Sequence, residues 1–221
     1  MQNAIELQRF LAERFPQIRL LSELQAPAAG SCYATGVTQI DSLLEGGLPK
    51  GALTELVRDD KKPGSSLLLS MILREARQQW VGLIDGRDSF DPGSLDFKPS
   101  RLLWIRCQEA GSALKAADLL LRDGNLPLLL LDLGLNPAAQ LRKISSTMWY
   151  RLQRLIEHKS TAMLVITPRA MVSSAKARLF LTGDFQLDAL EKSRGTLMSQ
   201  LKVALQNKRF HAAESEWAQA G

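Results

Sequence analysis

Residues 52–73 read ALTELVRDDKKPGSSLLLSMIL. The first part, Ala52 to Val57, is apolar enough to form a buried strand, and Ser65 opens an apolar stretch of helical character. A strand, a loop and a helix in this order hold phosphates when the loop reads G-x-x-x-x-G-K-[ST], because backbone N–H groups and one lysine must surround the anion. This segment therefore predicts the frame of a phosphate-binding α/β domain.

The loop inside this frame does not carry the motif. Arg58 and Pro63 stand at the two glycine positions, and Gly64 stands at the lysine position. Pro63 has no N–H to donate, and the carboxylates of Asp59 and Asp60 would repel a polyphosphate. Lys62 is either a solvated loop residue or a point charge for phosphate without the cradle. We therefore expect a degenerate nucleotide site formed by Arg58, Lys62, Pro63, Gly64 and Ser65.

Composition limits the classes of protein that remain. The chain has 221 residues, enough for one full α/β core, and an ordinary apolar content of 45%. No long apolar run and no signal-like N-terminus are present, so we expect a cytoplasmic protein without a membrane segment. Cys32 and Cys107 are far apart and only two histidines occur, so we expect neither a metal site nor a disulfide. The net charge of +5 suits nucleic acid and an ordinary solvated surface equally well.

Strands and helices are expected to alternate after residue 50. Continuous apolar strands joined by helices predict a mostly parallel sheet flanked by helices, the fold class α/β. Two later apolar stretches, 179–181 and 200–205, are expected to be edge strands. The expected domains are an N-terminal helical arm and linker (1–30), a core (31–210) and a flexible tail (211–221). The other expected strands and helices span 80–85, 102–106, 126–131 and 162–167, and 65–79, 110–122 and 138–157.

The order of these segments resembles the RecA recombinase family over roughly residues 35–210. The stretches that carry the resemblance are TGVTQID at 35–41, GGLPKG at 46–51, LIDGRDSFDP at 83–92, LLLLD at 128–132 and AMLVITP at 162–168. Within the superfamily, the short length and the phrase GALTEL at 51–56 look most like the ImuA family, RecA-like accessory factors of bacterial mutagenic translesion synthesis. The resemblance implies a RecA-like core.

The resemblance also implies which catalytic groups are missing. The family's catalytic glutamate falls at Arg87, and a cation cannot act as general base. Its sensor glutamine falls at Pro168, or at Thr167 if the frame slips by one residue. The Walker B aspartate is retained as Asp132, although an aspartate at a strand end can equally cap the next turn. We therefore expect no ATP hydrolysis and no bound cofactor, with Arg58 and Arg87 paired to nearby aspartates in the vacated site.

Recombinases of this family hold single-stranded DNA with two loops, which fall here near 133–145 and 169–178. The resemblance makes five basic residues of these loops candidates for DNA contact, and ordinary surface charge is the alternative for each. The second loop is short for strand pairing, and no aromatic residue is interleaved with the cations. The five candidates are Arg142, Lys143, Arg169, Lys176 and Arg178.

Two terminal segments are candidates for partner docking. Phe10, Leu11 and Phe15 lie on one face of an expected N-terminal helix, which either docks on a neighbouring protein or folds back on its own core. Trp217 lies among small and acidic residues of the tail, which is either a docking peptide or a loose end.

Taken with the degenerate site, the resemblance implies a non-catalytic accessory protein of the DNA damage response. The expected partners are the RecA recombinase, an inactive Y-family polymerase-like protein, or both, together with single-stranded DNA. Two alternatives stay open. One is a regulator that caps or inhibits RecA filaments. The other is a weak ATPase with a relocated site, built from Lys61 or Lys62 and a glutamate such as Glu109.

Overall fold

The computed structural model describes residues 31–58, 64–183, 196–197 and 200–208. These residues form a central sheet whose seven strands are β3 (Ala52–Arg58), β4 (Val81–Asp85), β5 (Leu102–Arg106), β6 (Leu128–Asp132), β7 (Ala162–Thr167), β8 (Ala177–Gly183) and β9 (Leu201–Lys208). The strand order is β5-β4-β6-β7-β3-β8-β9, and every neighbouring pair is parallel except β8 and β9. The predicted α/β fold with a mostly parallel sheet is confirmed.

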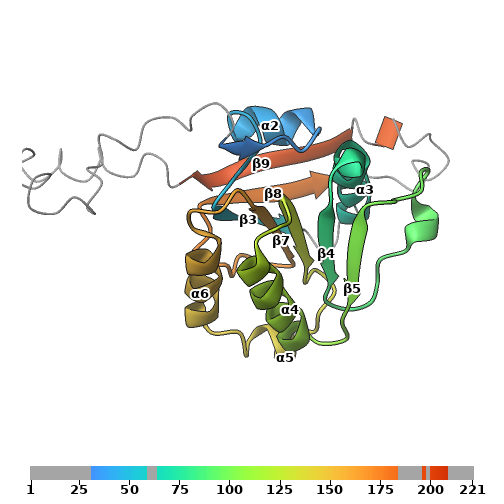
Figure 1. The fold of residues 1–221 in the computed structure, drawn as a ribbon. Coiled ribbons are helices and arrows are strands. Elements are labelled where there is room, and N and C mark those ends of the chain that lie inside the picture. Colours follow the sequence, from blue (N-terminus) through green and yellow to red (C-terminus); the bar gives the residue numbers. More distant parts are fainter. Residues whose placement is uncertain (1–30, 59–63, 184–195, 198–199, 209–221) are drawn as a thin grey trace, which may run out of the picture. The chain divides into compact units, whose positions relative to one another are not determined.

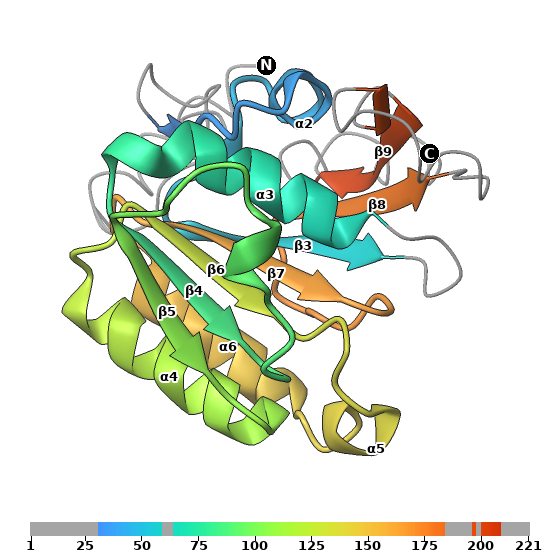
Figure 2. The same cartoon turned by 90° about the vertical axis from the view of Figure 1, so that its right-hand side faces the viewer.

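Helices cover both faces of this sheet. Helix α3 (Ser65–Glu75) lies on one face together with the short helix α2 (Thr38–Leu43), while α4 (Ala110–Asp123) and α6 (Ser146–Ile156) lie side by side on the other (Figures 1 and 2). The smaller elements are α5 (Ala138–Leu141), the 3₁₀ turns η2 (Ala76–Gln78) and η3 (Pro92–Ser94), and the antiparallel pair β1 (Cys32–Tyr33) and β2 (Leu48–Pro49).

Each face of the sheet contributes to a separate apolar core. Successive residues of a strand point to opposite faces, so Leu83 packs toward α3 and the neighbouring Ile84 packs toward α4 and α6. Trp149 of α6 and Leu121 of α4 are fully buried in the second core. Strands that are buried on both faces read as continuous apolar runs, which explains why the sequence of β4, β6 and β7 predicted them well.

Two of the predicted elements were wrong in detail. The single helix expected over 138–157 is divided into α5 and α6, because the chain is extended at Ser145 (φ −75°, ψ 153°), a residue type that favours the position before a helix. The segment 179–181 belongs to β8, which is an interior strand between β3 and β9 and not an edge strand. The stretch expected at 200–205 corresponds to β9, which begins at Leu201 and does lie at the edge of the sheet.

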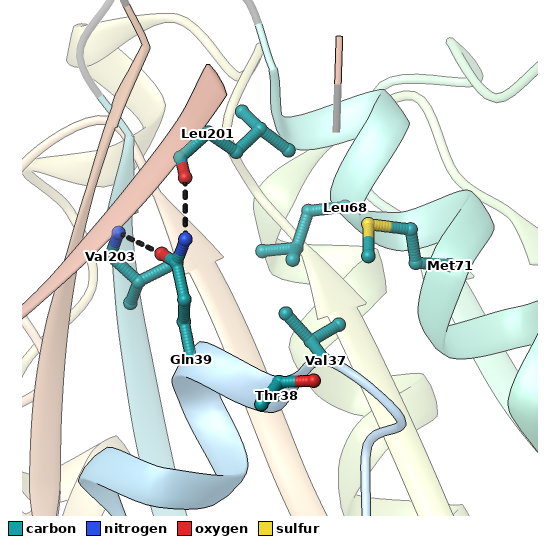
Figure 3. Close-up of a pocket in the computed structure, with 7 residues that line it drawn as sticks. All are labelled: Val37, Thr38, Gln39, Leu68, Met71, Leu201 and Val203. Carbon is teal, nitrogen blue, oxygen red and sulfur yellow. Dashed lines mark hydrogen bonds between the residues drawn. The ribbon is translucent and has the colours of Figure 1, made fainter. Parts of the chain in front are cut away.

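Helix α2 also covers the open side of the edge strand β9. The Gln39 side chain donates from Nε2 to the carbonyl oxygen of Leu201 (2.9 Å) and accepts from the Val203 N–H at Oε1 (3.0 Å), as Figure 3 shows. One side-chain amide thus replaces a neighbouring strand for two backbone groups of β9. An apolar cavity of about 230 Å³ opens beside this contact, between Val37, Leu68, Met71 and β9 (Figure 3).

Some expectations fall outside the described residues. These are the arm at 1–30 with Phe10, Leu11 and Phe15, the loop residues Lys62 and Pro63, and the tail at 211–221 with Trp217. Within the described part of the chain, no helix is long and apolar enough to cross a membrane.

Candidate functional site

The candidate site lies where the parallel strands end. Arg58, Asp85, Asp132 and Thr167 are the last residues of β3, β4, β6 and β7, and these strands are neighbours in the sheet. Asp85 and Asp132 are directly opposite each other in the register of β4 and β6. Ligands of open α/β sheets bind beyond the carboxyl ends of the strands. This carboxyl edge of the sheet is therefore the candidate functional site.

Asp132 faces a cation that belongs to the chain itself. Its Oδ1 atom accepts a hydrogen bond from the Gly134 N–H (2.8 Å). The Arg58 side chain lies against Gly134, since a β-carbon added there would be 2.8 Å from the Arg58 Cδ and 3.0 Å from the Asp132 Oδ1. The structure thus places Arg58, at the first position of the degenerate loop, beside Asp132, the residue at which the resemblance predicts the Walker B aspartate.

Burial is the main influence on the pKa of Asp132 and raises it above the ordinary value. The Gly134 N–H acts in the opposite direction, the Asp85 carboxylate raises the pKa further, and the Arg58 guanidinium lowers it. A carboxyl whose pKa is higher in the folded than in the unfolded protein binds its proton more tightly when folded. Its contribution to stability is therefore present below the ordinary aspartate range, about pH 4, and is lost as the pH rises through the raised value.

We expect Asp132→Asn to abolish this loss of stability at rising pH, because the amide oxygen still accepts the Gly134 N–H but carries no charge. The free energy of unfolding of the wild type should fall relative to Asp132→Asn as the pH rises from about 4 to 7. Urea denaturation at a series of pH values measures the difference. Arg58→Met, which removes the compensating cation, should steepen the decline. A wild type that gains stability over Asp132→Asn in this range would contradict the assignment.

The second acidic strand end organises the backbone of the next turn. Asp85 is buried, and its carboxylate accepts hydrogen bonds from the Phe90 N–H (2.7 Å), the Arg87 N–H (3.2 Å) and the Ser89 hydroxyl (3.4 Å). The Arg87 side chain is exposed and donates from Nη1 to the carbonyl oxygen of Gln108 (3.1 Å). Arg58 therefore lies beside Asp132, whereas Arg87 is directed toward the connection between β5 and α4.

Gly64 and Ser65 lie at the start of α3. Gly64 adopts φ 148°, a conformation that is essentially restricted to glycine, and its carbonyl oxygen accepts the Leu68 N–H (2.9 Å). Ser65 is the first residue of the helix. The glycine at the lysine position of the motif is thus required by the backbone at this helix start.

A buried ion pair inside the sheet, next to this edge, was missed by sequence reasoning. Glu55 in the middle of β3 is fully buried, and its Oε2 atom accepts from the Arg178 Nε of β8 (2.6 Å). Its Oε1 atom accepts from the Thr167 hydroxyl (2.9 Å) and from the N–H groups of Met171 (2.7 Å) and Val172 (3.1 Å). The carboxylate therefore fixes the connection between β7 and β8 to the sheet.

This connection is the second loop for which DNA contact was predicted. Arg178 also donates from Nη2 to the Val172 carbonyl oxygen (3.2 Å), so its side chain is committed to the fold and is a poor candidate for phosphate contact. Lys176 is partly buried, and its N–H donates to the carbonyl oxygen of Leu53 (2.8 Å). Arg169 is exposed. In the first loop, Arg142 and Lys143 are both exposed between α5 and α6.

Comparison of the sequence with protein families and curated proteins finds no match. The fold and the site define an α/β domain with a mostly parallel seven-strand sheet, of a kind compatible with P-loop and RecA-like domains. Membership of the RecA family stays a prediction from the sequence.

Proposed function

We propose that the chain is a non-catalytic RecA-like accessory protein of the DNA damage response. It acts by binding a recombinase such as RecA, an inactive Y-family polymerase-like protein, or both, together with single-stranded DNA. The observation that supports this proposal best is the position of Arg58 beside Asp132, at the edge where a phosphate loop and a magnesium ion would meet.

Phosphoryl transfer needs groups that these residues do not supply. A P-loop enzyme holds the phosphates with backbone N–H groups and a lysine, and it holds Mg²⁺ near an acidic strand end. Here Gly64 stands at the lysine position and Arg87 at the position of the catalytic glutamate in the resemblance. The carboxylates of Asp85 and Asp132 accept hydrogen bonds from the chain's own backbone. These contacts favour a binding role over catalysis.

The first test of this proposal is nucleotide binding. We expect isothermal titration with Mg-ATP to give no saturable heat at concentrations where an active RecA protein, used as the positive control, is saturated. Micromolar affinity for Mg-ATP would contradict the proposal and favour the relocated ATPase site.

The second test is recognition of the filament. We expect the protein to raise the fluorescence anisotropy of a labelled oligo(dT) above the signal of RecA and ATP alone, because its proposed partner is the protein filament. Electron microscopy of the same samples separates the capping alternative, since a cap shortens filaments at substoichiometric amounts. No change in anisotropy and no change in filament length would remove RecA as the direct partner.

A further inference from the structure

Helices α4 and α6 form an exposed basic surface on the side of the sheet opposite α3. They run side by side over the sheet face (Figures 1 and 2). Two hollows open along the line where they meet. One, of about 410 Å³, lies near the first turns of both helices beside Lys115 and Lys143. The other, of about 310 Å³, lies beside Arg122, Tyr150, Arg151 and Arg154. We call the two hollows together the α4–α6 groove.

The charge of this groove is positive. Its lining, counted together with the partly buried Asp118 that pairs with two of the arginines, contains five basic groups, Lys115, Arg122, Lys143, Arg151 and Arg154, and two acidic groups, Glu109 and Asp118. Three positive charges are therefore in excess within one groove, out of a net charge of +5 for the whole chain. Clustering of cations along one groove favours an anionic chain as the occupant.

One carboxylate holds two of the arginines in place. The Asp118 Oδ2 and Oδ1 atoms accept from the Nε of Arg122 and the Nε of Arg151, both at 2.7 Å, while about half of each arginine side chain stays exposed (54% for both). Each arginine uses its Nε for Asp118, and its Nη atoms make no hydrogen bond with any other described residue, so they are left for a ligand. A pre-positioned guanidinium loses less conformational entropy when it binds phosphate.

An aromatic ring lies among these cations. Tyr150 is 52% exposed although it belongs to a helix whose Trp149 is fully buried. Arg154, one turn further along α6, makes no hydrogen bond or ion pair with any described residue. An exposed ring flanked by guanidinium groups is the arrangement on which unpaired bases stack while the arginines contact the backbone phosphates.

From these contacts we infer that the α4–α6 groove binds single-stranded nucleic acid, with Tyr150 stacked on a base and with Arg122, Arg151 and Arg154 on the phosphates. The inference rests on the proposed function, which includes contact with single-stranded DNA. It adds helices α4 and α6 to the loops as a place where the DNA binds. Lys143 connects the two, because it follows α5 in the first loop and also lines the hollow beside Lys115. An acidic protein segment would satisfy the cations but would leave the exposed ring without a base.

The inference is tested by fluorescence anisotropy of labelled oligo(dT) with the full chain, without RecA, at low and moderate salt. Tyr150→Ala should weaken binding on the order of tenfold, whereas Tyr150→Phe should bind like the wild type because the ring is kept. Arg154→Ala should weaken binding and reduce the slope of log affinity against log salt by about one. Arg77→Ala, which removes an exposed arginine from the opposite face, is the matched control and should have little effect.

Each other result has a distinct meaning. If Arg169→Ala weakens binding while Tyr150→Ala and Arg154→Ala do not, DNA lies on the loop and the groove inference is wrong, although the proposed function stands. If the wild type binds no oligo(dT), the groove inference is wrong, and the RecA experiment alone decides the proposed function. If polyglutamate competes as well as oligo(dT) of equal charge, the occupant is an acidic protein and the inference is again wrong. Circular dichroism of each variant confirms that it is folded.

Discussion

Replacing Glu55 by Ala is expected to lower the free energy of unfolding by about 3–5 kcal/mol, because one partner of a buried ion pair is removed. The substitution leaves the Arg178 guanidinium, whose side chain is only 23% exposed, without its carboxylate. It also leaves the N–H groups of Met171 and Val172 without their acceptor. Urea denaturation followed by circular dichroism measures the loss.

Conservative variants of the same pair separate the contribution of its charges to stability from the contribution of its hydrogen bonds. Glu55→Gln keeps an acceptor for the backbone N–H groups and should cost less than Glu55→Ala. Arg178→Met should be costly, since it leaves a fully buried carboxylate unpaired, and adding Glu55→Gln to it should recover part of the loss. Glu157→Ala, at an exposed glutamate, is the control and should stay within about 0.5 kcal/mol of the wild type. A loss below about 1 kcal/mol for Glu55→Ala would contradict a structural role.

The same variant should also loosen the connection between β7 and β8. Nine residues, 168–176, join these parallel strands, fewer than the usual crossover, because β8 begins opposite Thr54 in the middle of β3. The Glu55 carboxylate holds this short connection by accepting hydrogen bonds from the backbone N–H groups of Met171 and Val172. Limited trypsin digestion should therefore cut after Arg169 and Lys176 faster in Glu55→Ala than in the wild type. This loop is fixed by the core, which distinguishes it from a loop free to insert between bases.

The strands of the sheet could be predicted because most of them are apolar on both faces. Their limits depend on single residues. The strand expected from 126 begins at Leu128, since Pro127 has no N–H for the ladder. The order of the strands in the sheet, by contrast, could not be predicted. The apolar residues of β8 gave no sign that β9 would pair with its outer side, because a local pattern does not identify the neighbour of a strand.

The carboxyl edge was only partly predictable for the same reason. Arg58 and Asp132 could be singled out from the loop motif and from the strand end. Glu55 and Arg178 could not be paired, since they are 123 residues apart and meet through the register of β3 and β8, where they are direct cross-strand neighbours. The usable signal was a charged residue inside each of two largely apolar strands, Glu55 in β3 and Arg178 in β8. A charge in a buried strand requires a partner.

Gly86→Ala is expected to destabilise the protein by about 3 kcal/mol, because the new methyl group has no space at the carboxyl edge. A β-carbon there would lie 2.4 Å from the Asn136 Oδ1 and 2.6 Å from the Asp132 carbonyl oxygen. That carbonyl accepts the Gly86 N–H (2.8 Å), and the Asn136 Nδ2 donates to the Gly86 carbonyl oxygen (2.7 Å). Neither neighbour can move without breaking a buried hydrogen bond, so the strand ends of β4 and β6 must separate.

Gly111→Ala should change the free energy of unfolding in the opposite direction. Gly111 lies in the first turn of α4, and a β-carbon added to it would meet nothing within 4 Å. Alanine is the better helix former, so Gly111→Ala should stabilise by about 0.5–1 kcal/mol. The difference between the two alanine variants in urea denaturation thus measures how closely the chain's own atoms pack at the carboxyl edge. Equal stability of Gly86→Ala and the wild type would mean that this edge can open, which would restore space for a ligand and weaken the case for a non-catalytic domain.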